Sequence, residues 1–411
     1  MMSKASLPAI IIALSIIGFF GVLSLGYLLS SQPMVFLEYK NPDGMVWSDY
    51  IDFFRASENI IAGKSPYEIP FDRYVTTPIP AIANVLFVPL GFDTARALFY
   101  LLIPFSLVAG YLLITTSFEF KKTDKSSVLI AGLVSLLFSY PFYFLLQREN
   151  IDGWVFLFLC SGFYWLAKPK KEPVSGLFFS LAIAFKIYPI LLLVPLLLGK
   201  KWRYLFWTGV WLALWGAITF FWISDFQNAL ATRSQTVFRF DENGSLVSTI
   251  SFISIFFSAF GVTFPASLIK YSPVIAGLLY SLLFSTVVYI DYKISKTETY
   301  KIHDYMMYLP FMIALPQNVY HYSFVICLIL IPAICHLWNK AEDRTHKAAI
   351  LVISIGIAIS QLQAIAIYHL TDNILSQAIP GIGLFIIMSG IVLFKILGFT
   401  KHFSRHEFSH S

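Results

Sequence analysis

Apolar runs approaching twenty residues recur along this chain from one end to the other. As an α-helix, a run of about 20 residues crosses the roughly 30 Å hydrocarbon core of a bilayer. Within lipid the backbone must satisfy its own hydrogen bonds, which favours helices. Charged residues make up only 13% of the chain, whereas soluble domains are about a quarter charged. The sequence therefore predicts an all-α polytopic membrane protein and excludes a soluble enzyme.

About twelve segments are expected to cross the membrane. They are residues 7–31, 94–118, 126–146, 151–167, 174–185, 187–199, 203–222, 272–290, 305–316, 322–338, 347–367 and 381–398. The first run is longer than a signal-peptide core and lacks a small-x-small cleavage site, so it is expected to be a retained helix. The three cysteines lie in or beside apolar runs, which indicates core packing rather than a disulfide framework or a zinc site.

Lysine and arginine predict the orientation of these spans. With the N-terminus inside, the inner segments hold 19 of the 29 basic residues and 9 of the 23 acidic residues. Both termini are therefore expected in the cytoplasm, with residues 399–411 as a cytoplasmic tail. Two outer loops, at about 32–93 and 223–271, would extend from a single transmembrane domain of residues 1–411.

A short amphipathic helix is predicted within the first outer loop, in the stretch WSDYIDFFRASENIIAGKSPYE at residues 47–68. Ser48 is a plausible N-cap, and Gly63 is a plausible stop. One side is predicted to carry Tyr50, Phe53, Phe54, Ser57, Ile60 and Ile61. The opposite side would carry Asp49, Asp52, Ala56 and Asn59. The two carboxylates either face the interior of the bundle or serve only as helix-start acids that suit the helix dipole.

Several motifs occur in one order along the chain. The first has the form D-[FY]-x-x-[YF]-[YF]-x-A followed by G-x-x-x-Y, at Asp49 to Tyr67, and proline-rich turns follow it. Residues 148–152 read R-E-N-I-D, with glutamate where R-G-N-I-D is usual. Residues 175–203, SGLFFSLAIAFKIYPILLLVPLLLGKKWR, match G-x-x-x-x-x-A-x-x-x-K-x-x-P before basic residues. Asn243-Gly244-Ser245-Leu246 is similar to N-Q-S-L, and His321 stands where a late histidine is frequent.

Together these motifs, which cover most of the chain, resemble glycosyltransferase family 87 of the GT-C superfamily. Characterised members of that family include polyprenol-phosphate-mannose-dependent mannosyltransferases. The resemblance implies a GT-C-type bundle of about twelve transmembrane helices, with an outer-face amphipathic helix after the first span. It implies transfer of a hexose, with mannose favoured, from a polyprenyl-phosphate donor to a lipid or glycan acceptor at the outer face of a prokaryotic plasma membrane. No nucleic-acid partner is expected.

By the same resemblance, Asp49 is the general base that takes the proton of the acceptor hydroxyl, and the anomeric configuration inverts. Asp52, one turn further along, would orient an acceptor hydroxyl. In an alternative, the two carboxylates bind a divalent cation, although two carboxylates alone are a small ligand set. No metal site or other cofactor is otherwise expected.

Lys186 is the most informative candidate for binding the donor phosphate. It interrupts an apolar stretch, where a charge facing lipid costs at least a few kcal/mol. Two short half-spans, 174–185 and 187–199, would place Lys186 at an outer apex, near the developing charge of the leaving phosphate. The alternative is one long span in which Lys186 pairs internally with an acidic residue.

The remaining candidates lie in the expected outer turns and loops. Arg148, Arg233, Arg239 and His321 are candidates for the donor phosphate. Asn150, Asp152 and Asn243 are candidates for the sugar or the acceptor. For each there is a structural alternative: an ion pair in the 148–152 turn, a solvated loop for the later arginines and Asn243, and a hydrogen-bonded interfacial histidine.

Other classes of protein fit the composition as well. A lipid-linked sugar transporter or flippase would carry inverted repeats and broken helices that meet at mid-membrane, and no convincing internal repeat is visible. A non-catalytic protein with a GT-C-like shell would not need Asp49. A membrane polysaccharide polymerase, with a diphosphate donor, would call for more outer arginines.

Overall fold

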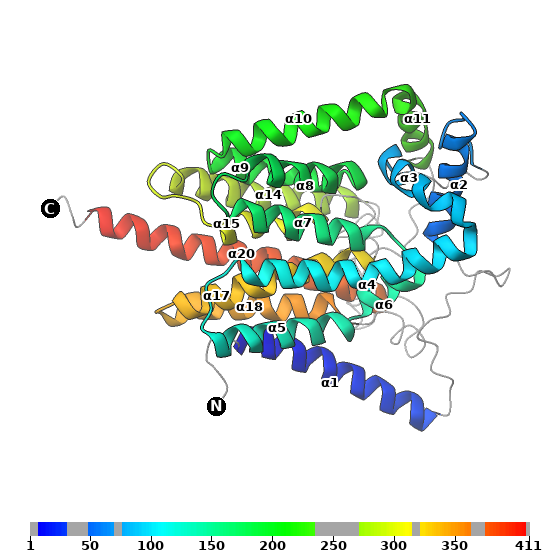
Figure 1. The fold of residues 1–411 in the computed structure, drawn as a ribbon. Helices are drawn as coiled ribbons and strands as arrows, with labels where there is room; N and C mark the ends of the chain where they lie inside the picture. Colours follow the sequence, from blue (N-terminus) through cyan, green and yellow to red (C-terminus); the bar gives the residue numbers. More distant parts are fainter. Residues whose placement is uncertain are drawn as a thin grey trace.

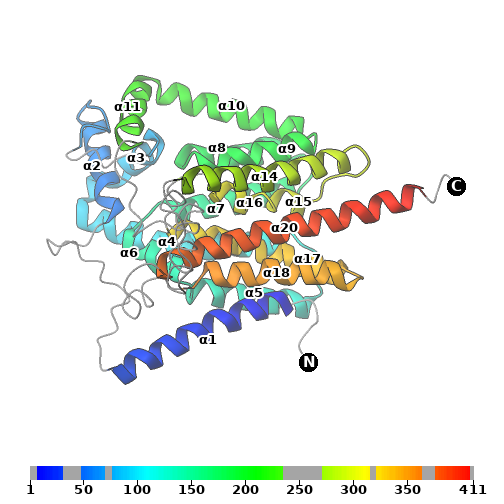
Figure 2. The same ribbon diagram turned by 180° about the vertical axis from the view of Figure 1, so that it is seen from behind.

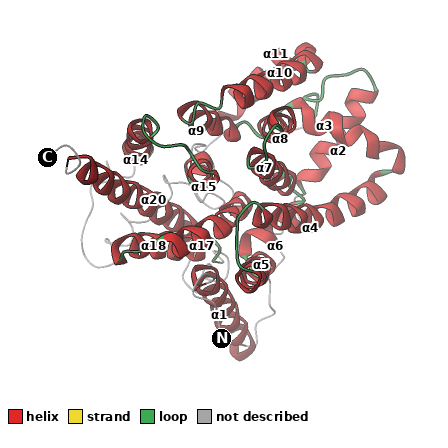
Figure 3. Ribbon diagram, turned by 60° about the vertical axis from the view of Figure 1, so that its left-hand side comes forward, coloured by secondary structure: helices red, strands yellow, loops and turns green. Residues whose placement is uncertain are grey.

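A computed structural model describes residues 7–30, 48–69, 76–234, 271–314, 321–362 and 375–407. Within these ranges the regular elements are helices, and Figure 3 draws them with loops and no strands. The elements are α1 (Leu7–Ser30), α2 (Asp49–Ile61), α3 (Pro78–Asn84), η2 (Val85–Leu90), α4 (Phe92–Thr116), α5 (Lys122–Leu137), α6 (Tyr140–Arg148), α7 (Asp152–Leu166), α8 (Glu172–Phe185), η3 (Tyr188–Leu192), α9 (Leu193–Leu198), α10 (Trp202–Ile218), η4 (Phe220–Trp222), α11 (Ile223–Ser234), α14 (Ser272–Ile294), α15 (Ile302–Met306), α16 (Leu309–Ala314), η6 (His321–Ile329), α17 (Leu330–Lys340), α18 (Arg344–Ser360) and α20 (Leu375–Glu407). The prediction of an all-α chain is confirmed for the described residues.

Most of the long helices run side by side along one common direction (Figure 1). The first residue of α1 and the last residue of α20 lie at one end of this bundle, whereas α2, α3 and α11 lie at the other end (Figures 1 and 2). Helix α4 packs against α7, α7 against α8, α8 against α10, and α18 against α20. The bundle therefore has two distinct ends, and the expected amphipathic helix lies opposite the start of α1.

Among the described residues, four helices are long and apolar enough to cross a membrane. They comprise Phe92–Thr116, Ser272–Ile294, Ser323–Lys340 and Ile379–Lys401. Two bent helix pairs raise the number to six if each counts as one span. An integral membrane protein is thus supported, while the figure of twelve spans stays a prediction.

Many of the remaining predicted spans coincide with shorter helices, several of them buried within the protein. Helix α16 is buried along its whole length, and α7 is buried over most of its length. A helix that is apolar all round fits the core of a large bundle as well as lipid. By contrast, α10 buries only Tyr204 and Thr208, and its exposed rings and aliphatic side chains are suited to acyl chains.

The predicted span 126–146 is broken near its middle. Helix α5 ends at Leu137, and α6 begins at Tyr140 with a bend of 53° between them. The Ser139 hydroxyl accepts a hydrogen bond from the N–H of Phe142, and Pro141 stands in the first turn. Both features favour a new helix start. This bend directs the end of α6 towards α2.

The described parts of the two predicted outer loops are largely helical. Within 32–93 the chain forms α2, α3 and η2, and within 223–271 it forms α11. Helix α2 begins as predicted, with the Ser48 hydroxyl accepting from the N–H of Tyr50, and it ends just before Gly63 at φ +71°. Its buried face differs from the prediction at two positions, because Ala56 is fully buried and Ile61 is exposed.

Candidate active site at the α2 end of the bundle

The turn between α6 and α7 forms the centre of the site. Arg148 ends α6, Asp152 begins α7, and Glu149 adopts a left-handed conformation with φ 50° and ψ 48°. Glycine populates this region without a steric penalty, which accounts physically for a motif in which glycine is usual at this position. In this chain a glutamate adopts the left-handed conformation that glycine would adopt freely.

Asp49 lies against this turn. One oxygen of its carboxylate accepts a hydrogen bond from Arg148 Nη2 at 2.5 Å, and the other accepts from Asn150 Nδ2 at 2.5 Å. The Asp49 side chain remains 18% exposed. A carboxylate oxygen has two lone pairs, so each oxygen of Asp49 can still accept a further hydrogen bond. The structure thus brings together three residues that the sequence singled out separately.

A second carboxylate, that of Asp152, lies on the other side of Asn150. It is fully buried and accepts hydrogen bonds from Tyr188 Oη at 3.1 Å and Ser323 Oγ at 2.5 Å. The Asn150 side-chain oxygen accepts from the backbone N–H of Asp152 at 3.0 Å. Asn150 therefore contacts both Asp49 and the first residue of α7, joining the two carboxylate environments.

Lys186 reaches the same cluster. Its backbone is extended between α8 and η3, so the chain breaks there as predicted. Its ammonium lies 3.7 Å from Asp152 Oδ1, and the side chain is 18% exposed. The Thr77 hydroxyl donates to the carbonyl of Ala184, which ties the end of α8 to the start of α3. A chain break at Lys186 and its pairing with an acidic residue, which belonged to opposite alternatives, therefore occur together, while two half-spans with an outer apex stay a prediction.

For most of the remaining predicted site residues, the side chain lies outside the described part of the structure. Asp52 lies one turn along α2 and is partly buried. Arg233 belongs to the last turn of α11, and His321 begins η6, but their side chains lie outside the described part of the structure, as do Arg239 and Asn243 entirely. Ser323 bonds Asp152, so the start of η6 comes to this site.

Several partners in the cluster were not predicted from the sequence. Tyr188 lies within the K-x-x-P motif, two residues after Lys186, and Ser323 lies two residues after His321. Ser48 and Arg96 both contact Glu149. The Ser323–Asp152 contact joins residues 171 positions apart, so no local pattern could have indicated it.

The cation alternative for Asp49 and Asp52 can be weighed against this geometry. No group of three or more histidine, cysteine, aspartate or glutamate side chains that could hold a metal ion occurs among the described residues. The guanidinium of Arg148 already lies on one oxygen of Asp49, and a neighbouring positive charge opposes a second cation. The described side chains around Asp49 therefore offer a divalent ion few ligands.

Comparisons with known proteins bear on what this cluster does. The model of glycosyltransferase family 87 matches residues 78–360, which include Arg148 and Lys186 but not Asp49. A GPI mannosyltransferase 1 from Dictyostelium discoideum is 29% identical over 172 residues. That match covers 40% of this chain and 37% of the relative, so the chain spans well under half the length of the curated relative it matches.

Proposed function

The chain belongs to glycosyltransferase family 87, and on that premise we propose that it is a membrane glycosyltransferase acting at the α2 end of the bundle. It moves a hexose, with mannose favoured, from a polyprenyl-phosphate donor to a lipid or glycan acceptor. The observation that carries this proposal is the partly exposed Asp49 carboxylate, held by Arg148 and by Asn150, which also bonds the backbone of Asp152, the partner of the Lys186 ammonium.

In the proposed reaction, Asp49 takes the proton of the acceptor hydroxyl while the oxygen attacks the anomeric carbon. The bond from that carbon to the phosphate oxygen breaks, the polyprenyl phosphate leaves with the electron pair, and the anomeric configuration inverts. A positioned base supplies about 10²- to 10⁴-fold in such a step. Arg148 and Asn150 fix the orientation of the carboxylate, because each contacts a different oxygen.

Lys186 is proposed to bind the donor phosphate. Its partner Asp152 is fully buried and accepts hydrogen bonds from Tyr188 and Ser323. The Lys186 ammonium is therefore held by a fixed carboxylate, while the Lys186 side chain stays partly exposed. Such a fixed cation stabilises the charge that develops on the leaving phosphate. Arg233, Arg239 and His321 remain proposed as further phosphate contacts, and Asp52 and Asn243 as contacts of the acceptor or the sugar.

The site is proposed to face the outside of a prokaryotic plasma membrane, with both termini in the cytoplasm. Support comes from the concentration of lysine and arginine in the segments expected inside, and from the position of α2 at the end of the bundle opposite the start of α1 (Figure 1).

A transfer assay tests the proposal. Purified protein is given polyprenyl-phosphate sugars that differ in the hexose, with and without a chelator, and a labelled membrane-lipid acceptor extract. We expect a glycosylated product and free polyprenyl phosphate in equal amounts. Loss of turnover on chelation would favour the cation alternative. Movement of the donor across a vesicle bilayer without any product would favour a flippase, and neither product nor movement would favour a non-catalytic protein.

A further inference from the structure

Three consecutive residues of the α6–α7 turn contact two consecutive residues at the start of α2. Arg148 and Asn150 both contact Asp49, as described above. Between them, Glu149 Oε2 accepts a hydrogen bond from the Ser48 hydroxyl at 2.5 Å. Ser48 is also the N-cap of α2, since its hydroxyl oxygen accepts from the N–H of Tyr50 at 3.2 Å. Glu149 therefore contacts the residue that starts the helix on which Asp49 stands.

Glu149 occupies an unfavourable place for a glutamate. Its backbone is left-handed, which disfavours a residue with a β-carbon, and it is only 4% exposed, which disfavours a carboxylate without partners. The structure supplies those partners. Besides Ser48, Arg96 of α4 donates from Nε to both carboxylate oxygens of Glu149, at 2.7 and 2.9 Å. A glycine would suit the backbone, but it would lose the connection from α4 to α2.

We propose that Glu149 is a positioning residue for Asp49, linking Arg96 of α4 through Ser48 to the first turn of α2. The proposal rests on the proposed function, in which Asp49 takes a proton. When it does so, the carboxylate loses its charge and with it the ion pair to Arg148. The Glu149–Ser48 link does not involve Asp49, so it holds the start of α2 in place through that step.

The test compares Glu149→Gly with the wild type. Glycine keeps the left-handed turn and removes only the link. Because displacement of a catalytic group by about 1 Å costs on the order of 100-fold, we expect kcat to fall by about 10- to 100-fold while the donor KM changes little. Ser48→Ala removes the other half of the link together with the N-cap of α2, so the double variant should lose no more than Ser48→Ala alone. Glu149→Gln keeps an acceptor for Ser48 and is expected to retain more activity than Glu149→Gly.

Lys170→Gly is the matched control. Lys170 is also left-handed, with φ 57°, but it is exposed and lies in the loop between α7 and α8. Relief of backbone strain is therefore the same in both variants, and only Glu149→Gly cuts the link to α2. Unchanged kcat in Glu149→Gly, or an equal loss of kcat in Lys170→Gly, would overturn the proposal.

Hydrogen–deuterium exchange gives a readout that does not need activity. We expect Glu149→Gly to speed exchange of the amides at the start of α2, around Phe53 and Phe54, and Lys170→Gly to leave them unchanged. Unaltered exchange in Glu149→Gly would overturn the positioning role even if no donor supports transfer. Absence of product from the wild type would instead count against the proposed function alone.

Discussion

At the residue scale, the two carboxylates of the site differ in what surrounds them. Asp49 is partly exposed and is held by two donors, whereas Asp152 is fully buried among Tyr188, Ser323 and Lys186. A base must reach its substrate, so partial exposure suits Asp49 for proton transfer. Full burial suits Asp152 for anchoring the Lys186 ammonium.

Asp49→Asn is expected to lower kcat by about 10²- to 10⁴-fold, the usual contribution of a general base, because an amide does not accept the acceptor's proton. Donor binding should remain, because the proposed phosphate contact, Lys186, is unchanged, and the single amide oxygen can still accept a hydrogen bond from Arg148 or Asn150. The measurement is transfer rate and donor affinity in purified protein. Asp93→Asn is the control, because Asp93 also lies in the first turn of a helix but is exposed. Full activity in Asp49→Asn removes the base assignment.

Lys186→Ala is expected to raise the donor KM by about 10- to 100-fold, the equivalent of one hydrogen bond to a charged group. This change also leaves the buried Asp152 without its cation, so stability falls as well. The double variant Lys186→Ala/Asp152→Asn separates the two effects. It should recover thermal stability but not donor affinity. Recovery of both would mean that Lys186 serves Asp152 alone.

Site residues could be predicted where the neighbouring sequence marked them, and not where only long-range packing placed them. Asp49 followed from its helix-start position together with a resemblance, and Lys186 from a charge within an apolar run. Ser323 and Tyr188 gave no such signal, because a serine and a tyrosine are ordinary in apolar helices. Their roles arise only from the packing of η6 and η3 against the start of α7.

At the element scale, side-chain caps fix where several helices begin. Ser139 and Pro141 start α6 at a bend from α5, Ser48 starts α2, and Asp343 starts α18. Ser48 was recognisable as a cap because a helix stop followed it at a suitable distance. The break at Ser139 was not recognised, since the apolar run continues through it and hydropathy alone does not register a change of direction.

Ser139→Ala tests the bend. Ser139 is fully buried, and loss of an N-cap of this kind costs about 1 kcal/mol. Because α6 carries Arg148 at its end, we expect a lower unfolding temperature together with a reduced kcat. Thr345→Ala, an exposed position in the first turn of α18, is the control. A normal kcat in a destabilised Ser139→Ala protein would show that the bend does not set the position of Arg148.

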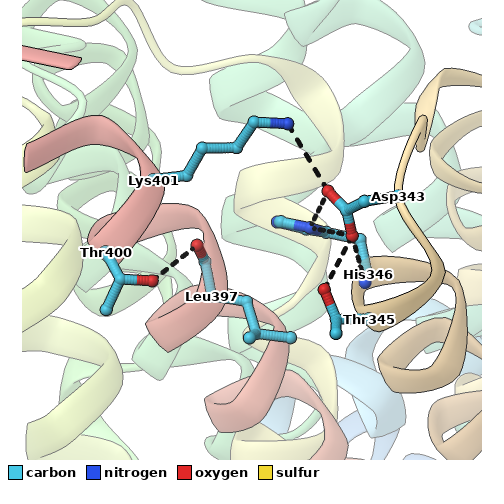
Figure 4. A network of polar contacts seen from close by, with 6 residues as sticks. All are labelled: Asp343, Thr345, His346, Leu397, Thr400 and Lys401. Carbon is cyan, nitrogen blue, oxygen red and sulfur yellow. Dashed lines mark hydrogen bonds and ion pairs between the residues drawn. The ribbon is translucent and has the colours of Figure 1, made fainter. Parts of the chain in front are cut away.

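The start of α18 has a carboxylate with several donors. Asp343 accepts hydrogen bonds from the backbone N–H of His346 and the hydroxyl of Thr345, and it contacts the His346 ring and Lys401 of α20 (Figure 4). The backbone N–H of His346, the Thr345 hydroxyl and the His346 ring hold the pKa of Asp343 well below its usual range. Because the folded-state pKa is depressed, this stabilisation is present above the ordinary aspartate pKa of about 3.9 and is lost as the pH falls below it.

Asp343→Asn is therefore expected to lower the unfolding temperature at pH 7. The difference from the wild type should shrink as the pH is lowered from about 5 towards 2, through and below the ordinary aspartate pKa of about 3.9. Thermal unfolding of the two proteins at several pH values is the measurement. A difference that stays constant over this range would contradict the assignment of the shift to Asp343.

At the scale of the whole molecule, charge clusters stand at both ends of the bundle. Opposite the proposed site, the Lys395 ammonium of α20 lies 2.9 Å from Asp291 of α14 and 2.9 Å from Asp304 of α15. The membrane class was predictable from composition. The number of spans was not, because short buried helices such as α16 are as apolar as helices that face lipid.

Thiol labelling of single introduced cysteines tests the orientation. Glu58, exposed on α2, and Glu342, exposed before α18, lie near opposite ends of the bundle. The three natural cysteines are buried and should not react. We expect a membrane-impermeant reagent to label Glu58→Cys in intact cells and Glu342→Cys only after permeabilisation. The reverse pattern would put the proposed site on the cytoplasmic side.

The side-chain amide of Asn150 donates a hydrogen bond to Asp49 through its nitrogen and accepts one from the backbone N–H of Asp152 through its oxygen. Because the side-chain amide of Asn150 is planar and rigid, its nitrogen and its oxygen move together. In the proposed reaction, the residues that would bind the leaving phosphate and the residue that would take the proton are therefore connected through Asn150. Loss of the two Asn150 hydrogen bonds should uncouple departure of the phosphate from proton transfer to Asp49. Water would then compete with the acceptor hydroxyl, and hydrolysis of the donor would compete with transfer.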